Sequence, residues 1–139
     1  MKLSTAAELA IKGMTEVAEH YETGHVNIET ICGARSLPRQ YLSKIFNTLT
    51  KAGLVTPIRG KHGGYTLSRD PSKITLLQII EAIEGPLAVN LCQHTPSQCS
   101  ARDCNTRQVW KDIQRYVRQR LSATTLADCM AAQPATARK

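Results

Sequence analysis

The sequence predicts a mainly α-helical protein with a small β wing and a long helix near its C-terminus. Three observations support this prediction. Apolar residues recur at three- and four-residue steps in several segments, which is the period of an amphipathic helix. A glycine-rich turn separates two short runs of residues that favour β structure. The 139 residues suffice for one domain plus an appendage, and only 4% of them are aromatic, so aliphatic side chains must fill the core.

The first helix is expected over residues 5–21, where Thr5 and Glu8 have the spacing of a capping box. A second, short helix is expected over residues 27–34. Gly33 is unfavourable inside a helix and indicates that this second helix ends close to it. Both helices carry their apolar residues on one side, as helices that cover a core do.

A third helix begins where Ser36 can cap it and Pro38 suits its first turn. Its apolar stripe ends before Gly53, which is a common C-terminal stop. Residues 54–58 and 65–67 then have the pattern of two short strands around a glycine-rich hairpin tip. A helix, a tight turn, a capped helix and a hairpin, in this order, predict a winged helix-turn-helix.

A fourth helix starts at Thr75 and Gln78, another capping-box pair, and Gly85 ends it. A cysteine-containing loop separates it from a long helix, whose apolar stripe can pack in a core or pair two chains. The stripe consists of Val109, Trp110, Ile113, Tyr116, Val117 and Leu121. Thr125 and Asp128 indicate a short last helix. The expected organisation is a winged helix-turn-helix domain over 1–85, a cysteine loop over 86–104, a long helix over 105–123 that can act as a dimerisation helix, and a short helix with a frayed tail over 124–139.

The net charge of +7 is concentrated in one segment of the chain. Ala34 to Lys73 contains eight Lys and Arg residues and only one acid, Asp70, whereas the rest of the chain is neutral. A positive charge that is segregated in this way indicates a surface that binds nucleic acid, and a solvated basic face is the alternative. We therefore expect double-stranded DNA to be a partner.

In a winged helix-turn-helix, the third helix enters the major groove with its N-terminal residues toward the base edges. Arg39 could bind guanine or a phosphate there, and Gln40 could bind adenine. Glycines at the wing tip would let the backbone approach DNA closely, and Arg59 could enter a narrow minor groove. The predicted DNA-binding residues are Pro38, Arg39, Gln40, Ser43, Lys44, Arg59, Gly60 and Lys61.

Three of the five cysteines, Cys92, Cys99 and Cys104, lie in one loop. No apolar run reaches the roughly 18 residues of a membrane span and no signal-peptide pattern is present, so we expect a cytoplasmic protein without a membrane partner. Thiols in the reducing cytosol bind metals or sense redox state more often than they form disulfides. The loose spacing lacks a C-x-x-C pair. It leaves three alternatives: an iron–sulfur cluster with a fourth ligand from elsewhere, zinc with His94 added, or a thiol switch.

Three segments of the sequence resemble one family: the start MKLSTAAELAIKGM, the segment LPRQYLSKIFNTLTKAGLVTPIRGKHGGYTL, and the cysteine loop running into CNTRQVW. The family is that of the iron–sulfur winged-helix transcriptional regulators that include IscR, NsrR and RirA, and the resemblance spans nearly the whole chain. It implies a homodimer that binds a palindromic operator. It also implies a [2Fe–2S] or [4Fe–4S] cluster on the three loop cysteines, near the dimerisation helix, whose state controls DNA binding.

At the position of the fourth cluster ligand, this sequence has a different residue from one part of the family. IscR-like members carry a ligating histidine three residues after the last cysteine, and this position is Arg107 here, which stays protonated and cannot ligate. In NsrR-like members a carboxylate near the N-terminus of the partner subunit ligates, and Glu8 stands at the matching position. The resemblance implies Glu8 as a metal ligand, with a helix cap as its alternative role and with His94 or Asp103 in reserve.

We therefore expect a DNA-binding transcriptional regulator, a repressor, whose iron–sulfur cluster senses iron, oxygen, nitric oxide or redox state. We expect no enzymatic activity and no small-molecule substrate, because no catalytic arrangement is visible at a plausible spacing. A cluster-free winged-helix regulator that uses zinc, a thiol switch or a small metabolite is the alternative. A small iron–sulfur or thiol oxidoreductase is a further alternative, but it leaves the basic segment unexplained.

Overall fold

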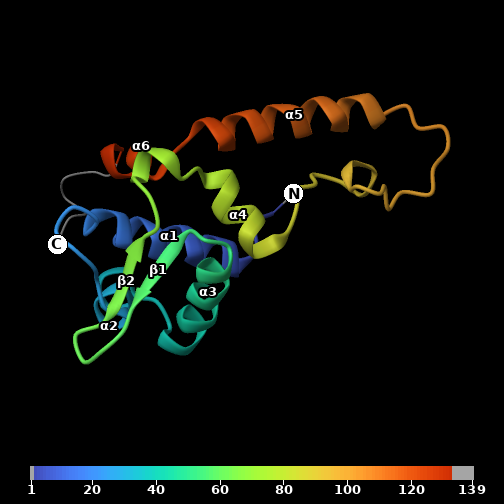
Figure 1. Cartoon of the computed structure of the whole chain (residues 1–139). Coiled ribbons are helices and arrows are strands. Elements are labelled where there is room, and N and C mark those ends of the chain that lie inside the picture. Colours follow the sequence, from blue (N-terminus) through green and yellow to red (C-terminus); the bar gives the residue numbers. More distant parts are fainter. Residues whose placement is uncertain (1, 133–139) are drawn as a thin grey trace.

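A computed structural model describes residues 2–132, and it is mainly helical with one two-stranded antiparallel sheet (Figure 1). The elements are α1 (Thr5–Glu19), α2 (Ile28–Arg35), α3 (Arg39–Lys51), β1 (Val55–Ile58), β2 (Gly64–Leu67), the 3-10 turn η1 (Pro71–Lys73), α4 (Leu76–Glu84), the 3-10 turn η2 (Leu91–Gln93), α5 (Arg107–Ala123) and α6 (Leu126–Ala131). This order confirms the predicted mainly α fold with a β wing. Within residues 2–132, no helix is long and apolar enough to cross a membrane. The predicted fraying of the tail concerns residues outside the described range.

Helix α1 lies at the centre of the winged part and packs against α2, α3, α4, α6 and β2. The side of α1 that faces the core has small buried residues, namely Ala7, Ala10 and Gly13, so neighbouring elements can approach its backbone closely. A Cβ on Gly13 would lie only 2.8 Å from the ring of Phe46, so α3 can approach α1 this closely only beside a glycine. The buried Phe46 ring also lies 4.8 Å from the ring of Tyr65 in β2. One core thus joins α1, α3 and the wing.

The predicted capping box of Thr75 and Gln78 is confirmed, and the predicted start of the last helix at Thr125 is also a capping box. At the start of α4, the backbone N–H of Gln78 donates to the hydroxyl of Thr75, and the N–H of Thr75 donates to the side-chain carbonyl of Gln78. Thr125 and Asp128 make the same pair of bonds at the start of α6. Both boxes close within a single turn, which is why local sequence is enough to locate them.

The predicted capping box of Thr5 and Glu8 is wrong, because the cap of α1 is one residue earlier. Ser4 has an extended backbone, and its hydroxyl accepts from the N–H of Ala7 at 3.1 Å. Glu8 therefore stands one position too late to reach back to the cap. Its side chain is exposed and has no hydrogen bond or ion pair within the described residues. Glu8 therefore has no capping role in this structure that would compete with a role as a metal ligand.

The predicted role of Ser36 as the cap of the third helix is also wrong. Ser36 closes α2 instead: its backbone is left-handed, with φ 53° and ψ 49°, and its N–H donates to the carbonyl of Cys32. Pro38 takes the N-cap position of α3 and makes no side-chain capping bond. A proline disfavours helical backbone at the residue before it, and Pro38 is itself extended, with φ −69° and ψ 124°, so α3 begins at Arg39.

The wing is fastened to the helices by its second strand. β1 and β2 pair with Val55 opposite Leu67 and Ile58 opposite Gly64. On the other side of β2, Tyr65 and Val26 form a bridge with N···O distances of 2.8 and 3.0 Å. A Cβ on Gly64 would lie 2.2 Å from the carbonyl oxygen of Val26, so this close approach requires glycine. The wing therefore has a fixed place relative to α2.

The chain leaves the core after α4 and returns to it at α6. Gly85, with φ 81°, ends α4, and the cysteine loop and α5 follow (Figure 1). The chain then re-enters beside η1, where Leu126 is fully buried and its N–H donates to the carbonyl of Ile74 at 2.9 Å. The N–H of Leu76 donates to the carbonyl of Thr124, also at 2.9 Å. Both ends of the excursion are thus fixed to the same core.

Helix α5 lies outside the winged part, along one side of the molecule in Figure 1, and contacts α4 and η2. None of its residues is buried. The predicted apolar stripe is present, but Val109, Ile113 and Tyr116 are 53%, 39% and 68% exposed. Large apolar side chains are usually covered in a stable assembly, so this face of the single chain lacks a partner.

Candidate DNA-binding face and cysteine loop

A groove of about 500 Å³ lies between the start of α2, the start of α3 and the wing. It brings together five of the eight predicted DNA-binding residues, namely Arg39, Ser43, Arg59, Gly60 and Lys61. The remaining three, Pro38, Gln40 and Lys44, are exposed on or beside the first turns of α3 and do not line the groove. The two halves of the prediction, helix and wing, are therefore parts of one surface.

The wing tip has the shape that its glycines predict. Gly60 has φ 112°, a conformation that strains any other residue, and its carbonyl accepts from the N–H of Gly63 at 3.1 Å. The ring of His25, in the loop before α2, donates to the carbonyl of His62 at 2.5 Å. The tip is thus held at both ends of its turn, and Arg59 and Lys61 project from it into solvent.

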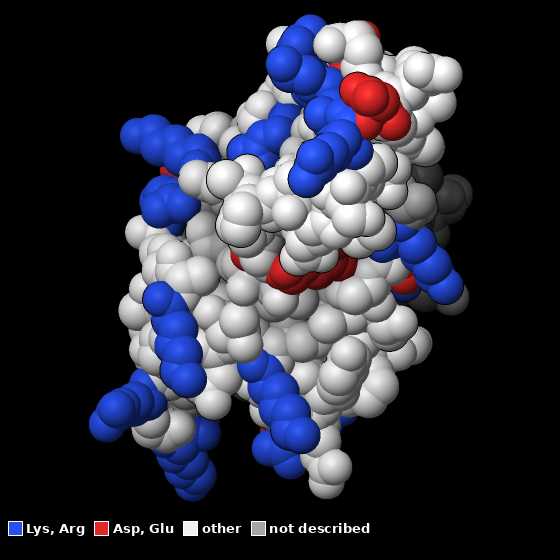
Figure 2. Space-filling view, turned by 90° about the vertical axis from the view of Figure 1, so that its right-hand side faces the viewer, with Lys and Arg blue, Asp and Glu red and all other residues white. Residues whose placement is uncertain are grey.

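The charge of this surface is mostly positive. Figure 2 views the molecule from the right-hand side of Figure 1, and Lys and Arg side chains are spread over both the lower half of this face, at the level of α3, and its upper part, whereas the acidic areas are fewer and lie near the middle and top. Among the described residues that line the groove, Glu29 is the only acid, and its carboxylate lies 2.7 Å from the guanidinium of Arg39. The pairing of Glu29 with Arg39 was not predicted from the sequence, because the two residues lie on different helices.

Arg35, one of the eight bases in the basic segment, points toward the core and not toward the groove. Its guanidinium donates to the carboxylates of Glu16 and Glu19, in both cases at 3.0 Å. Glu16 is buried, with 6% of its surface exposed, so this ion pair fixes the end of α2 to α1. The buried acid on the apolar side of the first helix is the sequence signal that could have identified a structural arginine.

The three predicted cysteine ligands lie on one loop but not in one cluster. Cys92 is half-buried in η2, and its sulfur accepts from the side-chain amide of Gln93 at 3.2 Å. Cys99 is half-buried and Cys104 is exposed shortly before α5. Within residues 2–132, no three His, Cys, Asp or Glu side chains come close enough together to hold a metal ion, and all five thiols are free. A single chain thus presents the donors without assembling them.

The donors nevertheless suit a cluster chemically. Hydrogen bonds from Thr106 lower the pKa of the Cys104 thiol, which favours the thiolate that ligates iron or zinc. By contrast, burial raises the pKa of Cys32 and Cys129. Cys32 packs against the core, as expected for a structural thiol. Cys104 therefore combines exposure with a lowered pKa, whereas Cys92 and Cys99 are half-buried, as are Cys32 and Cys129.

The other ligand candidates lie apart. Glu8 is exposed on α1, and His94 lines a cavity between α4 and α5. Asp103 is exposed beside Cys104. Arg107, at the position where some relatives of this kind carry a histidine, donates to the carbonyl of Ala101 at 2.6 Å and so ties the loop to the start of α5. Arg107 shapes the loop and does not ligate.

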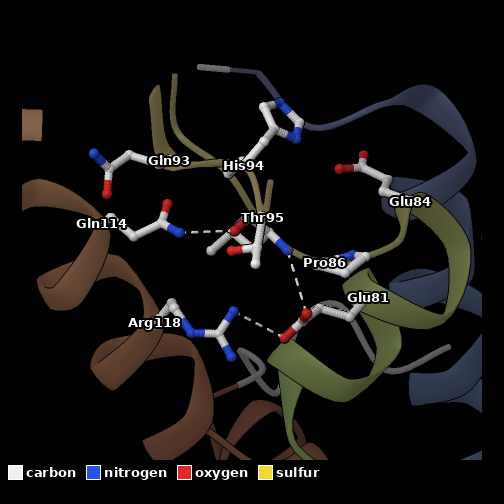
Figure 3. A pocket seen from close by; sticks show the side chains of 10 residues that line it. Glu81, Glu84, Pro86, Gln93, His94, Thr95, Gln114 and Arg118 are labelled. Carbon is white, nitrogen blue, oxygen red and sulfur yellow. Dashed lines mark hydrogen bonds and ion pairs between the residues drawn. The ribbon is translucent and has the colours of Figure 1, made fainter. Parts of the chain in front are cut away.

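A polar connection joins the base of the cysteine loop to both neighbouring helices (Figure 3). The side-chain amide of Gln114 in α5 donates to the carbonyl of Leu87 and accepts from the N–H of Val89, both at 2.9 Å. The carboxylate of Glu81 in α4 accepts from the N–H of Leu87 at 3.2 Å and pairs with Arg118 in α5 at 3.2 Å. We call these three side chains, Glu81, Gln114 and Arg118, the loop clamp.

The loop clamp lines a cavity of about 440 Å³, with His94 at the rim opposite Arg118 in Figure 3. The clamp fixes the residues just before Cys92 relative to the winged part. Glu81 and Gln114 were not among the residues predicted from the sequence. Both are polar residues on otherwise apolar helix faces, and this is the signal that could have indicated a buried hydrogen-bonding role.

Comparison with known proteins agrees with this fold. The family model described as "Rrf2: Iron-dependent Transcriptional regulator" matches residues 3–132. The HTH-type transcriptional regulator IscR of Yersinia pseudotuberculosis is 30% identical over 92% of this chain and 78% of its own length. The structure of CymR, the global cysteine regulator of B. subtilis, superposes with a TM-score of 0.84 at 30% identity, covering 96% of this chain and 99% of that one.

The structure of T. potens IscR superposes with a TM-score of 0.78 at 30% identity, covering 94% of this chain and 87% of that one. The family model and the Yersinia relative are described as transcriptional regulators, which confirms the prediction of a DNA-binding transcriptional regulator rather than an enzyme. The order of the helices and the wing in the structure is likewise that of a winged helix. The chain belongs to the Rrf2 family of winged-helix transcriptional regulators.

Proposed function

We propose that the protein represses transcription by binding a palindromic operator as a homodimer, and that an iron–sulfur cluster on its cysteine loop controls this binding. The observation that carries the proposal is the joint presence of a basic groove on the winged part and of three cysteines, one exposed and two half-buried, on a loop clamped to that part. The cluster would sense iron, oxygen, nitric oxide or redox state.

The groove supports contact with duplex DNA. Arg39, Arg59 and Lys61 would contact phosphates or base edges, and the exposed turns of α3 fit the major groove beside them. Affinity should fall steeply as salt rises, because each neutralised phosphate releases counterions. Arg59→Ala should weaken operator binding several-fold, whereas Arg115→Ala, at an exposed position on α5, should not. Equal losses in both variants would contradict the location of the DNA-binding surface.

The exposed stripe of α5 supports a two-fold dimer. A single α3 covers only one half-site, so a palindromic operator needs two copies of the chain. Pairing of two α5 helices would cover Val109, Ile113 and Tyr116, and it would also bring the cysteine loop of one chain near the other chain. Light scattering should then give about twice the mass of 15.3 kDa that the sequence predicts for one chain.

The cluster ligands that we propose are Cys92, Cys99 and Cys104 of one chain with Glu8 of the partner subunit. The carboxylate of Glu8 is exposed and has no other partner among the described residues, so it is available to a second chain. When bound, a cluster would supply a redox-sensitive group that cross-links the loop. The loop clamp offers the route to the DNA-binding surface, because Glu81 and Gln114 hold the base of the loop against α4 and α5.

Cysteine substitutions test the cluster. After anaerobic purification, Cys92→Ala, Cys99→Ala and Cys104→Ala should each lose the visible absorption, the iron and the sulfide, whereas Cys32→Ala should retain all three. Operator binding of the three loop variants should match that of the wild-type protein after its cluster has been removed by a chelator. An intact chromophore in the Cys99→Ala protein would refute the ligand assignment.

A cluster-free regulator with a thiol switch is the second candidate. Two observations favour it: no three ligating side chains come together within the described residues, and the chain is similar to CymR, which is named as a cysteine regulator. In that case the anaerobic protein would be colourless. Oxidation of the loop cysteines alone would change operator binding, and dithiothreitol would reverse the change.

A further inference from the structure

The positive groove contains a carboxylate at a place where it should oppose DNA. Glu29 lines the groove together with Arg39, Arg59 and Lys61, and its oxygen lies 2.7 Å from the Arg39 guanidinium. A surface that binds a polyanion would bind more tightly without this acid. We propose that Glu29 is a specificity determinant, which holds Arg39 toward a base edge and disfavours binding through phosphates alone. The proposal rests on the proposed use of this groove for DNA.

The two helices place this pair in a defined way. Arg39 is the first residue of α3, and the N-cap Pro38 gives no side-chain capping bond. A cation at this end is disfavoured by the helix dipole, so its own helix does not hold Arg39 in place. Glu29 stands in the first turn of α2, where an acid is favoured, and Asn27 caps that turn with a bond of 2.8 Å to the N–H of Thr30. Glu29 is thus the fixed partner, and Arg39 is the side chain that it positions.

The pair is complementary to a G·C base pair. A guanidinium has five N–H donors, so Arg39 can bond to Glu29 and still donate to the O6 and N7 atoms of guanine. The second carboxylate oxygen of Glu29 can accept from the N4 amino group of the paired cytosine. A phosphate at the same place would put a negative charge beside the carboxylate and would be repelled. The groove therefore favours a contact with a base edge over a contact with a phosphate of the DNA backbone.

The pair can be changed without damaging the fold. The side chains of Glu29 and Arg39 are 60% and 67% exposed, and exposed ion pairs contribute little to stability. The variant Glu29→Gln should therefore keep the melting temperature of the wild-type protein, and any change in DNA binding can be assigned to the lost charge.

The experiment uses the full chain, purified anaerobically, and a pool of randomised DNA duplexes. Sequences selected by the wild-type protein define a consensus. Dissociation constants for this consensus and for a scrambled duplex are then measured by fluorescence anisotropy at one salt concentration. The variants are Glu29→Gln, Glu29→Asp and Arg39→Ala. The matched control is Glu22→Gln, which removes the same charge from an exposed position after α1 that does not line the groove.

We expect Glu29→Gln to bind the scrambled duplex several-fold more tightly, and the ratio of consensus to scrambled affinity to fall about tenfold, as for the loss of one base-specific contact. Selection with Glu29→Gln or Arg39→Ala should no longer favour G·C at one position of each half-site. Glu29→Asp, which keeps the charge, should retain part of this preference. Glu22→Gln should leave both the ratio and the preference unchanged.

Two failures can be told apart. If Arg39→Ala and Arg59→Ala weaken consensus binding while Glu29→Gln keeps the wild-type ratio and base preference, the groove binds DNA but Glu29 does not determine specificity. If Arg39→Ala and Arg59→Ala both bind the consensus as the wild-type protein does, the groove is not the DNA-binding surface and the proposed function itself fails. A ratio that falls equally in Glu29→Gln and Glu22→Gln would indicate overall charge alone and would also overturn the inference.

Discussion

Replacement of Gly64 by alanine should detach the wing from the helices. A Cβ at this position would lie 2.2 Å from the carbonyl oxygen of Val26 and 2.8 Å from the Cα of Asn27. Both atoms belong to the backbone, so no side-chain rotation can relieve the collision. Strand β2 must move away from Val26, and the bridge between Val26 and Tyr65 must open.

The size of the effect follows from what the bridge contributes. Its two hydrogen bonds, at 2.8 and 3.0 Å, are worth about 1 kcal/mol each. The ring of Tyr65 also contacts the ring of Phe46 in a tilted arrangement with centroids 4.8 Å apart, and weakening such a pair costs about 0.5–1.5 kcal/mol. Gly64→Ala should therefore lower the free energy of unfolding by about 3 kcal/mol. DNA affinity should also fall, because Arg59 and Lys61 move with the wing.

The matched control is Gly33→Ala in α2. A Cβ on Gly33 meets no atom within 4 Å, and alanine favours a helix over glycine by about 1 kcal/mol, so this variant should be slightly more stable than the wild-type protein. Urea unfolding followed by far-ultraviolet circular dichroism gives both values. A Gly64→Ala protein with wild-type stability would refute the reasoning, since the strand would then have room that the structure does not provide.

Three further predictions concern the helix ends and the surface of α5. Ser4→Ala should lower the free energy of unfolding by about 1 kcal/mol through loss of the cap of α1, whereas Glu8→Ala should leave thermal stability unchanged; the reverse order would restore Glu8 as the cap. Ile113→Glu should convert the proposed dimer to a monomer with unchanged helix content, and light scattering that still gives a dimer would place the interface elsewhere. Hydrogen bonds from Thr125 lower the pKa of Asp128 in the folded protein. The ionised carboxylate therefore stabilises the fold at a pH above the ordinary carboxyl pKa, and this stabilisation is lost as the pH falls through the lowered pKa. Asp128→Ala should therefore melt earlier than the wild-type protein at neutral pH, with a gap that closes in acid; a gap independent of pH would assign the effect to the backbone alone.

The features that the sequence predicted well are those decided within a few residues. The capping box at Thr75, the helix start at Thr125 and the helix stop at Gly53 each depend on neighbours one turn away, and the structure has all of them. The predicted caps at Thr5 and Ser36 were the exceptions. Adjacent hydroxyl residues compete at the start of α1, and the turn between α2 and α3 required a left-handed residue at a position that also suited a cap.

The contacts that the sequence could not predict join separate elements. No local pattern encodes contacts that depend on how helices pack against each other. Three examples are the pairing of Glu29 with Arg39, the pairing of Arg35 with Glu16, and the contacts of the loop clamp. The conformation of the cysteine loop is likewise beyond a periodicity argument, because the loop has almost no regular structure between η2 and α5.

The return of the chain to the core at Leu126 leaves α5 fastened along its middle and at its C-terminal end, with its first turns free of the winged part. The loop clamp holds the middle through Gln114 and Arg118, and the strand-like contacts of Thr124 and Leu126 with η1 and α4 hold the end. A helix fixed at these two places cannot slide along the core, so we expect a change at the cysteine loop to appear as a tilt of α5 against the winged part. A chain truncated after Ala123 should therefore not fold as an independent DNA-binding domain, because the fully buried side chain of Leu126 is part of the hydrophobic core.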